Sequence, residues 1–565
     1  MKPPLRPIYA LFVALSLLTG KKSSNFLAST LPTTTIHLPS RHPRTHTHTH
    51  TDVILGQTFL SACQIQYLNQ MGAIGKGSVA NKTYTFIDPA TQDANCQLAL
   101  CQGDYNTCFQ PGKQAPTENL YLVFSDEFEE QGRKFGVEDQ DARWTAGDLY
   151  YFPTQDIEVY KPEQVTTWNG KAVITLEKAF PPLSAKSLQP DGKIWDVTKN
   201  YKSGMMNSWN KWCYTGGYLE MSVQLPGNDQ IPGFWPAFWA MGNLGRAGYM
   251  PSTAGLWPYS YDVCGDGSSQ ATATPGSKVP SQILPQCVQK PYDQEYINRT
   301  KYGMQEGVAR NAPEFDVFEV IVTPGGGSSA SQTLQMAPLL PPGQSWTDLQ
   351  FYDDNNLADG VNYPGALTYL NTNFNGWTGV NGRPGNEYQD SISAVSHLNS
   401  SFYTGQHTFG VDWAPGEYMR WYVDGLFAYE INPNALLPRT GTYSNGTQYT
   451  IGERMIPVEP MYIIFNLGMS KDFGEVDIEN LQIPAYMLVD YIRVYQRGDK
   501  MNVGCSPPEK PTDQWINCHK EDYMTSSKDE ILFGPCSGVW VCGSRIVVVL
   551  SIGLSILLHS FFSFQ

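Results

Sequence analysis

Short segments rich in β-branched and aromatic residues recur along the middle of the chain, separated by turns that contain Gly, Pro, Asn or Asp. This pattern is typical of strands, and few segments show a helical period. The predicted strands are 172–176, 218–225, 407–413, 419–423, 461–467 and 486–495. The dipeptide Asp424-Gly425 between two of them favours a two-residue β-hairpin turn. We therefore expect an all-β antiparallel sandwich, with long loop insertions near 259–313 and 324–400.

The two ends of the chain carry apolar runs. A positive start and the short run 8–18 predict a signal peptide or short anchor over 1–20, although an ordinary core segment is the alternative. Residues 21–59 are rich in Ser, Thr, Pro and His and predict a flexible stalk. At the other end, 546–565 predicts a membrane segment or a glycolipid-anchor signal, with a buried core helix as the alternative.

Eleven cysteines are present and none forms a CxxC pair, which argues against a zinc module. With the leader, they predict disulfides in an oxidising compartment. We expect Cys264 to pair with Cys287 and Cys505 with Cys518 as local loop closures. The cysteines also mark an N-terminal extension (60–117) and a C-terminal segment (501–545). Four N-glycosylation sequons agree with the secretory pathway: Asn81, Asn298, Asn399 and Asn445.

Composition narrows the ligand class. Aromatic residues make up 13% of the chain and charged residues 16%, which excludes coiled coils, helical solenoids and bulk disorder. The net charge of −15, without a long Lys/Arg cluster, argues against nucleic acid as a partner. A neutral ligand such as a glycan is compatible with this balance.

The segment PEFDVFEVIV (313–322) carries the candidate chemistry. In a regular strand, Glu314 and Asp316 share one face and Glu319 points to the other. A single bulge between Asp316 and Glu319 would turn all three acids to one side. Two glutamates would then approach the separation of about 5–5.5 Å that a retaining glycosidase needs. The alternative is a strand with one solvated acidic face.

Several motifs around this strand resemble glycoside hydrolase family 16. They are LVFSDEF (122–128), GFWPAFW (233–239), ExDxxE (314–319), HTFGVDW (407–413), RWYVDG (420–425) and VDYIRVY (489–495). That family contains laminarinases, lichenases and transglycosylases on a concanavalin-like jelly roll. The resemblance covers about 118–500 and implies a catalytic domain there, with Glu314 as nucleophile, Asp316 as assisting acid and Glu319 as general acid/base.

A closer resemblance is to the fungal β-glucan synthesis-associated proteins. It rests on YKSGMMNSWNK (201–211), MGNLGRAGY (241–249), WPYSYD (257–262) and NVGC (502–505). It implies a membrane-attached protein, lumenal or extracellular, that works with the glucan synthesis machinery on β-glucan polysaccharide. Unlike the simpler laminarinases, Trp257 is separated here from Glu314 by some fifty residues, an insertion that could roof the cleft.

Five further residues are candidates for sugar contacts. Trp235, Trp239 and Trp257 offer flat apolar faces to a pyranose ring, although tryptophan in a sandwich also serves as core. His407 begins a predicted strand and Arg246 lies in a Gly-rich loop. For both, a purely structural role is the alternative.

The resemblance also implies a structural calcium ion, since Glu127, Gly170 and Asp490 match positions where the wider family often holds one. We expect no other cofactor.

Three functions remain open on the sequence. The first is a retaining glycosidase or transglycosylase in β-glucan (β-1,6 and/or β-1,3;1,6) biosynthesis or cell-wall assembly. The second is a non-catalytic glucan-binding scaffold that supports glucan synthesis. The third is a secreted laminarin-type endo-β-1,3-glucanase. The acid trio favours an enzyme, because a lectin does not need two convergent glutamates.

Overall fold

A computed structural model describes the part of the chain that carries the predicted sandwich. The described residues are 54–55, 58–59, 86–91, 97–101, 117–188, 194–253, 256–262, 305, 308–336, 365–369, 371–375, 390–442, 448–451 and 453–524. The chain divides into two compact units, Met1–Thr51 and Asp52–Gln565, and all described residues belong to the second.

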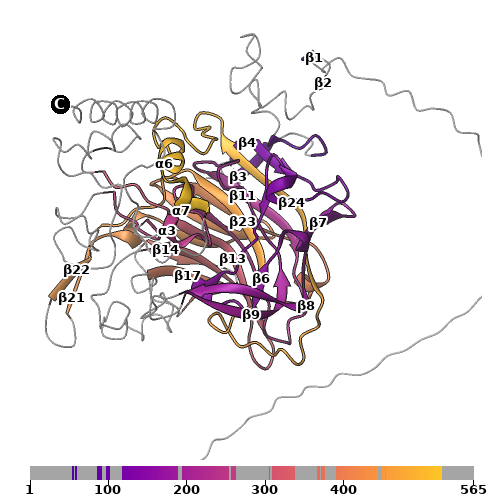
Figure 1. Ribbon diagram of the computed structural model, residues 1–565. Helices are drawn as coiled ribbons and strands as arrows, with labels where there is room; N and C mark the ends of the chain where they lie inside the picture. Colours follow the sequence, from indigo (N-terminus) through magenta and orange to yellow (C-terminus); the bar gives the residue numbers. More distant parts are fainter. Residues whose placement is uncertain are drawn as a thin grey trace, which may run out of the picture. The chain divides into compact units, whose positions relative to one another are not determined.

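Two large sheets form the fold (Figure 1). The first, in spatial order, contains β16 (Thr372–Phe374), β17 (Asp390–Leu398), β14 (Ser328–Met336), β13 (Glu314–Val322), β12 (Trp235–Gly242), β23 (Met461–Gly468), β10 (Met205–Asn207) and β5 (Thr145–Ala146). We call it the acid-bearing sheet, because β13 carries the three candidate acids.

The second sheet contains, in order, β15 (Ala366–Thr368), β20 (Leu426–Ile431), β19 (Tyr418–Val423), β18 (His407–Ala414), β11 (Gly217–Gln224), β24 (Ala485–Arg497), β8 (Lys171–Leu188), β9 (Ile194–Ser203) and β6 (Glu158–Tyr160). On this sheet β4 (Thr117–Asp126) pairs with β24 and with β3 (Gln97–Cys101), and β7 (Val165–Trp168) pairs with β8. Neighbouring strands run antiparallel except β6 and β9, which are parallel.

The remaining described elements are short. Two small hairpins join β1 (Ile54–Leu55) to β2 (Thr58–Phe59) and β21 (Arg439–Thr442) to β22 (Gln448–Ile451). The α-helices are α3 (Met250–Thr253), α6 (Asp513–Cys518) and α7 (Lys520–Met524). The 3₁₀ helices are η2 (Val137–Asp139), η3 (Phe152–Thr154), η4 (Pro162–Gln164), η6 (Ser400–Tyr403) and η7 (Pro433–Leu436).

The main core lies between the two sheets. Phe315 of β13 packs on Trp413 of β18 with ring centroids 5.7 Å apart. Phe318 packs on Phe409 at 4.5 Å. These large apolar side chains, all fully buried, fix which face of β13 points inward, so the opposite face is left for other uses. The all-β sandwich is confirmed.

The predicted strands agree closely with the structure. All six lie within β8, β11, β18, β19, β23 and β24 to within a residue. In the hairpin between β19 and β20, Asp424 and Gly425 have φ angles of 50° and 70°, the left-handed conformation that such a turn requires. The expectation that 324–400 is an irregular insertion is wrong in part, since β14 and β17 lie there. Their Ser, Thr and Gln residues hide the alternation that reveals a strand.

The disulfide prediction needs correction. Cys505 is bonded to Cys213, across 292 residues of sequence, and therefore does not pair with Cys518, which is itself in a disulfide. The local pairing was inferred from nearness in sequence, whereas the sheet brings distant segments together. The pair Cys264 and Cys287 lies outside the described residues.

Several other predictions fall on residues that the structure does not describe. They are the leader (1–20), nearly all of the stalk (21–59), the apolar tail (546–565) and the sequons at Asn81, Asn298 and Asn445. The fourth sequon residue, Asn399, is exposed at the start of η6. Within the described ranges, none of the helices has the length and apolar character needed to cross a bilayer.

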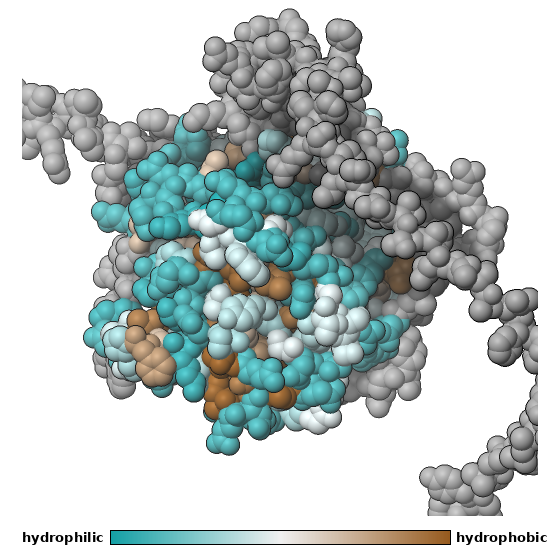
Figure 2. Space-filling view, turned by 90° about the vertical axis from the view of Figure 1, so that its right-hand side faces the viewer, coloured by the Kyte–Doolittle hydropathy of each residue, from teal (hydrophilic) through white to brown (hydrophobic). Residues whose placement is uncertain are grey.

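The segments flanking 118–500 are built into the second compact unit. From the N-terminal extension, β3 pairs with β4 at residues 97–101. From the C-terminal segment, α7 packs against α3 (Figure 1). On the face shown in Figure 2 the described residues are mostly hydrophilic, with small hydrophobic patches between them.

Candidate active site

The three acids lie on one face of β13 because the strand is bulged. The pairing of β13 with β14 shifts between Asp316 and Glu319, and the pairing with β12 shifts at the same place, leaving Val317 without a partner in either register. Val317 and Phe318 are both fully buried in the main core. The extra residue returns Glu319 to the side of Glu314 and Asp316. The predicted bulge is confirmed.

Each glutamate accepts a hydrogen bond from a tryptophan. The indole Nε1 of Trp257 donates to Glu314 Oε2 at 2.6 Å. The indole Nε1 of Trp235 donates to Glu319 Oε1 at 3.0 Å. The Trp235 ring in turn stacks on Phe473, with centroids 4.2 Å apart and planes 1° from parallel. Two of the three predicted sugar platforms therefore orient the carboxylates directly.

Asp316 is the most buried of the three acids, with 2% of its surface exposed, whereas both glutamates are half-buried. Its Oδ2 accepts a hydrogen bond from Gln335 Nε2 of β14 at 2.8 Å. The backbone oxygen of Asp316 accepts from Trp421 Nε1 of the opposite sheet, also at 2.8 Å. The central acid is thus fixed from the neighbouring strand and from across the core.

Burial raises the pKa of all three carboxyls. The pKa of Glu314 rises to about 8, chiefly through burial and then through the charge of Glu319, while the Trp257 indole opposes the shift. The pKa of Glu319 rises to about 7 through burial, opposed by Trp235. The pKa of Asp316 lies well above its usual range through burial and the charges of Glu319 and Glu314. The trio therefore retains protons near neutral pH.

The higher of the two glutamate values falls on Glu314, the residue that the sequence motif marks as nucleophile, although a nucleophile has to be ionised to attack. The motif, and not the order of the pKa values, therefore carries the assignment of roles.

Trp239 lies opposite Asp316 on β12 but is buried, and its Nε1 donates to Asn466 Oδ1 at 2.9 Å. Asn466 then donates to the Tyr160 hydroxyl at 3.1 Å. This contact places Trp239 in packing beside the acids rather than on an open surface. Its role as a sugar platform stays a prediction.

A second group of buried acids lies beyond Tyr160. The pKa of Asp156 is raised to about 7 by burial, against hydrogen bonds from Thr154 and Tyr160. The pKa of Glu158 is raised well above its usual range by burial and by Asp156. Both Glu158 oxygens accept from the Met469 backbone N–H at 3.1–3.2 Å. These acids fix the segment 154–160 to the end of β23.

Sequence analysis did not single out Tyr151, Tyr462 or Gln335. Burial and then the charge of Glu314 raise the pKa of Tyr151 well above its usual range, which places this ring beside the acids. Tyr462 is fully buried one strand away, and its hydroxyl accepts from the Ala247 backbone N–H at 2.9 Å. Only pairing of distant strands reveals these neighbours, so no sequence signal could have identified them.

His407 does not belong to the sheet that carries the acids. It begins β18 of the opposite sheet, where Nδ1 contacts Asp424 Oδ2 at 2.7 Å and the ring stacks on Phe402. The contact of His407 with a sugar stays a prediction. The imidazole contacts the Asp424-Gly425 hairpin. The motif HTFGVDW, which begins with His407, supplies core residues to the second sheet.

Arg246 is engaged by packing contacts. Its Nη1 donates to the Tyr523 backbone oxygen at 2.6 Å, and its guanidinium lies over the rings of Trp209 and Tyr249. We describe Arg246 as a residue that fixes the C-terminal helices. Its contact with a sugar stays a prediction.

The calcium prediction does not fit the residues present. Both Glu127 oxygens accept from Arg493 at 2.8–2.9 Å, and Asp490 pairs with Lys171 at 2.5 Å. A positive side chain thus already neutralises each carboxylate that was expected to bind the ion, and repels a cation. Gly170 has a φ angle of +71° in the β7–β8 hairpin, a turn role that explains the glycine. Among the described residues, no group of three or more His, Cys, Asp or Glu side chains is arranged so that it could hold a metal ion.

The sequence is similar to those of several known proteins. The family model of the beta-glucan synthesis-associated proteins SKN1/KRE6/Sbg1 matches residues 95–530. SKN1 of Candida albicans is 36% identical over 422 residues, covering 72% of this chain and 49% of that protein. KRE6 of Saccharomyces cerevisiae is 34% identical over 422 residues, covering 72% of this chain and 51% of that protein. The chain spans about half the length of these curated relatives.

Solved structures give a more distant similarity. The laminarinase catalytic domain of Thermotoga petrophila is 18% identical, with a TM-score of 0.36, over 67% of this chain and 99% of that one. The endo-β-1,3-glucanase of Pyrococcus furiosus is 17% identical, with a TM-score of 0.35, over 67% of this chain and 95% of that one.

Proposed function

Since the chain belongs to the SKN1/KRE6/Sbg1 family of beta-glucan synthesis-associated proteins, we propose that it is a retaining β-glucan-active glycosidase or transglycosylase that works in β-glucan biosynthesis. The observation that carries this proposal is the bulge in β13, which turns Glu314, Asp316 and Glu319 to one face. Double displacement at a sugar uses two carboxyl groups that face the same site, and here an indole donor orients each of them.

In the first step, a Glu314 oxygen attacks the anomeric carbon of the glucan as the bond to the leaving sugar oxygen breaks. Glu319 donates its proton to that oxygen, so a neutral sugar hydroxyl departs and a glycosyl ester on Glu314 remains. In the second step, Glu319 accepts a proton from the incoming hydroxyl, whose oxygen attacks the anomeric carbon and releases Glu314 as a carboxylate.

The incoming hydroxyl decides the outcome. Water gives hydrolysis, whereas a sugar hydroxyl gives transfer and builds a new glucan linkage. We favour transfer, because the curated relatives are described as associated with beta-glucan synthesis. Asp316 lies between the two glutamates, and its buried charge or proton biases which of them holds a proton.

The proposed setting is the secretory pathway, with the domain on the lumenal or extracellular side. The Cys213–Cys505 disulfide agrees with an oxidising compartment. Attachment through the apolar tail 546–565 and glycosylation at the four sequons are part of the same proposal.

Covalent labelling tests the proposed roles. A mechanism-based 2-deoxy-2-fluoro-β-glucosyl fluoride or an epoxide-bearing glucan oligomer should modify Glu314, as identified by peptide mapping. Glu319→Gln should slow turnover by about 10³-fold or more, since a general acid of raised pKa is lost. Azide, which needs no general-base assistance to attack in the second step, should partly restore turnover of an activated substrate. Glu314→Gln should abolish both labelling and turnover.

A non-catalytic scaffold is the second candidate, because the description of the curated relatives names synthesis and no hydrolysis. For a scaffold, the full-length protein would bind β-glucan without modification of Glu314, and Glu314→Gln would leave binding and glucan assembly unchanged. That outcome would contradict the enzyme.

The rate should also depend on pH in a way set by the two glutamates. Their pKa values of about 8 and about 7 imply that one proton is shared between them in this interval. Above about pH 8 the coupled pair holds no proton, so the general acid is lost. Below about pH 7 the pair holds two protons, so the nucleophile is protonated, and kcat/KM should peak at pH 7–8. A rate that stays constant between pH 5 and pH 10 would contradict this arrangement.

A further inference from the structure

A second, smaller core lies on the face of the acid-bearing sheet that carries the acids. It contains Trp239 and Met241 of β12, Tyr462 and Ile464 of β23, and Trp515, Ile516, Cys518 and Tyr523 of the C-terminal segment. All eight are buried. Side chains from the segment that follows the last described strand, β24, therefore complete the packing on the face that carries Glu314.

The C-terminal segment is hydrogen-bonded to, and packed against, the loop that leads from β12 toward Trp257. The Tyr523 hydroxyl donates to the Leu244 backbone oxygen at 2.5 Å, and the Tyr523 ring stacks on Trp209 at 5.5 Å. Arg246 of the same loop donates to the Tyr523 backbone oxygen. The fully buried side chain of Asn243 donates to Thr512 Oγ1 at 2.9 Å.

The same segment also holds the residues that enter β13. The buried Arg310 makes two hydrogen bonds with Glu459, at 2.7 and 2.8 Å, and a third with the Pro511 backbone oxygen at 2.9 Å. The Ala312 backbone N–H donates to the Leu256 backbone oxygen at 3.0 Å. Leu256 directly precedes Trp257, so the loop and the start of β13 are joined next to the 2.6 Å bond between Trp257 and Glu314.

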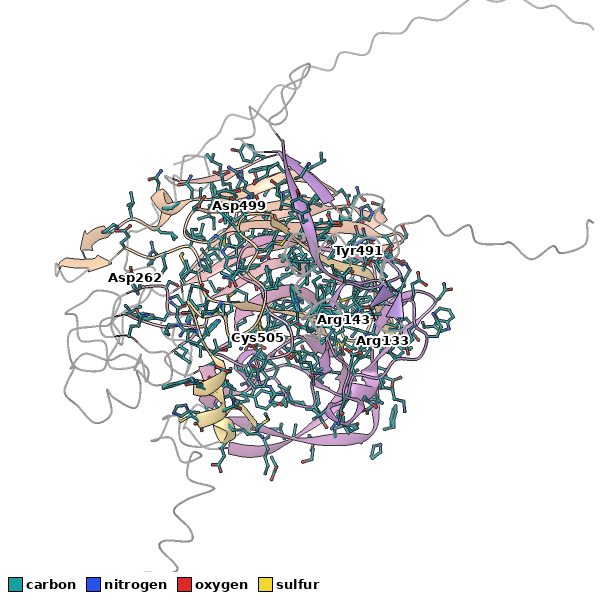
Figure 3. The ribbon with its side chains drawn as sticks, turned by 90° about the horizontal axis from the view of Figure 1, so that it is seen from above. Arg133, Arg143, Asp262, Tyr491, Asp499 and Cys505 are labelled. Atoms are coloured by element: carbon teal, nitrogen blue, oxygen red, sulfur yellow. A yellow bond between two sulfur atoms is a disulfide. The ribbon has the colours of Figure 1, made fainter. Side chains whose placement is uncertain are left out.

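From these contacts we propose that residues 505–524, which we call the C-terminal clamp, are a positioning element for Glu314. The clamp fixes the Trp257 loop on one side and the start of β13 on the other, and so holds the indole against the carboxylate. Cys505 (labelled in Figure 3) anchors the clamp through its disulfide to Cys213. Tyr523 and Thr512 are its positioning residues, because they reach Glu314 only through the loop.

The clamp has a measurable electrostatic consequence. The Trp257 indole lowers the pKa of Glu314 against the effect of burial. A loosened loop weakens that hydrogen bond, so the pKa of Glu314 should rise further. The catalytic part of this inference rests on the proposed function, whereas the change in the Glu314 titration does not.

The experiment uses the full chain labelled with ¹⁵N at its tryptophan indoles. The Trp257 indole N–H resonance, assigned by its loss in Trp257→Phe, should report the titration of Glu314. In Tyr523→Phe and Thr512→Val its midpoint should move to higher pH by about half a unit or more, as expected when a charge-assisted hydrogen bond weakens. In turnover, kcat should fall about tenfold with KM within about twofold, since a misplaced group affects the reaction more than binding.

Tyr218→Phe is the matched control. It removes one hydroxyl from a buried tyrosine of the opposite sheet, where that hydroxyl donates to Glu220 at 2.9 Å. It should change neither the Trp257 midpoint nor kcat. The clamp is refuted if both clamp variants leave the Trp257 midpoint where it is in the wild type, whether or not their melting temperatures fall. If the midpoint moves and no variant or wild-type protein turns over glucan, the clamp stands and the proposed function fails.

Discussion

At the scale of single residues, burial and hydrogen-bond donors have opposite effects on the protonation of the two candidate glutamates. Burial favours the protonated form of Glu314 and Glu319, whereas the indoles of Trp257 and Trp235 favour the charged form. The two tryptophans come from different segments, one in the loop after β12 and one at the start of β12 itself. Each glutamate can therefore be tuned by its own neighbour.

The raised pKa values also predict how stability depends on pH. Glutamates with an ordinary pKa of 4.5 rise to about 8 and about 7 in the folded protein, so the folded state holds protons that the unfolded chain has released. Their contribution to stability is complete below pH 4.5 and is lost as pH rises through 7 to 8.

Glu314→Gln and Glu319→Gln should therefore raise the melting temperature at pH 8.5 by about 2–4 °C, and by much less at pH 4.5. Thermal unfolding followed by circular dichroism at the two pH values checks this. An equal gain at both would mean that charge is not the cause. Glu417→Gln, at an exposed surface pair with Lys500, is the control and should show no such pH dependence.

At the scale of elements, the bulge in β13 determines that the three acids face the same side of the strand. If all residues of β13, Val317 included, followed a regular pleat, their side chains would alternate strictly and Glu319 would face the main core. Val317 and Phe318 both point into that core, and the partner strands β12 and β14 are continuous opposite them. The bulge is thus confined to one residue of one strand.

Deletion of Val317 should convert β13 into a regular strand without changing the pairing of Asp316 with Trp239 or of Glu319 with Ala237. The three acids should stay on one face, at a cost of about 2–4 kcal/mol for the lost core side chain. Deletion of both Val317 and Phe318 should turn Glu319 into the core and prevent folding.

Chemical denaturation of the single-deletion variant measures the cost in stability. The ¹⁵N resonance of the Trp235 indole, which donates to Glu319, reports whether Glu319 keeps its position. A single deletion that unfolds as completely as the double deletion would show that the bulge is needed for more than the facing of the acids.

At the scale of the whole described unit, distant segments are tied together around the acid-bearing sheet. The Cys213–Cys505 disulfide links the segment after β10 to the segment after β24. Because it closes a loop of 292 residues, it restricts the unfolded chain strongly, and it also anchors the C-terminal clamp.

The double substitution Cys213→Ala with Cys505→Ala should lower the free energy of unfolding by about 2–5 kcal/mol. Residues 505–524 should then become accessible to limited proteolysis before the sandwich unfolds. Thermal unfolding and mass mapping of the first cleavage sites measure this. Cleavage that begins in the sandwich itself, with the clamp intact, would contradict the anchoring role.

The sequence by itself determined the class of fold, six of the strands, the Asp424-Gly425 turn and the bulge that gathers the acids. These features are local, since they follow from alternation, turn residues and the spacing of residues along one strand. The polar strands β14 and β17 could not be predicted from the sequence, because Ser, Thr and Gln do not mark a buried face. Tertiary structure alone decided that Trp235 and Trp257 hold the glutamates, that His407 belongs to the other sheet, that Arg493 and Lys171 occupy the expected calcium ligands, and that Cys505 pairs with Cys213. All of these depend on which segments, from 57 to 366 residues apart in the sequence, the two sheets bring into contact.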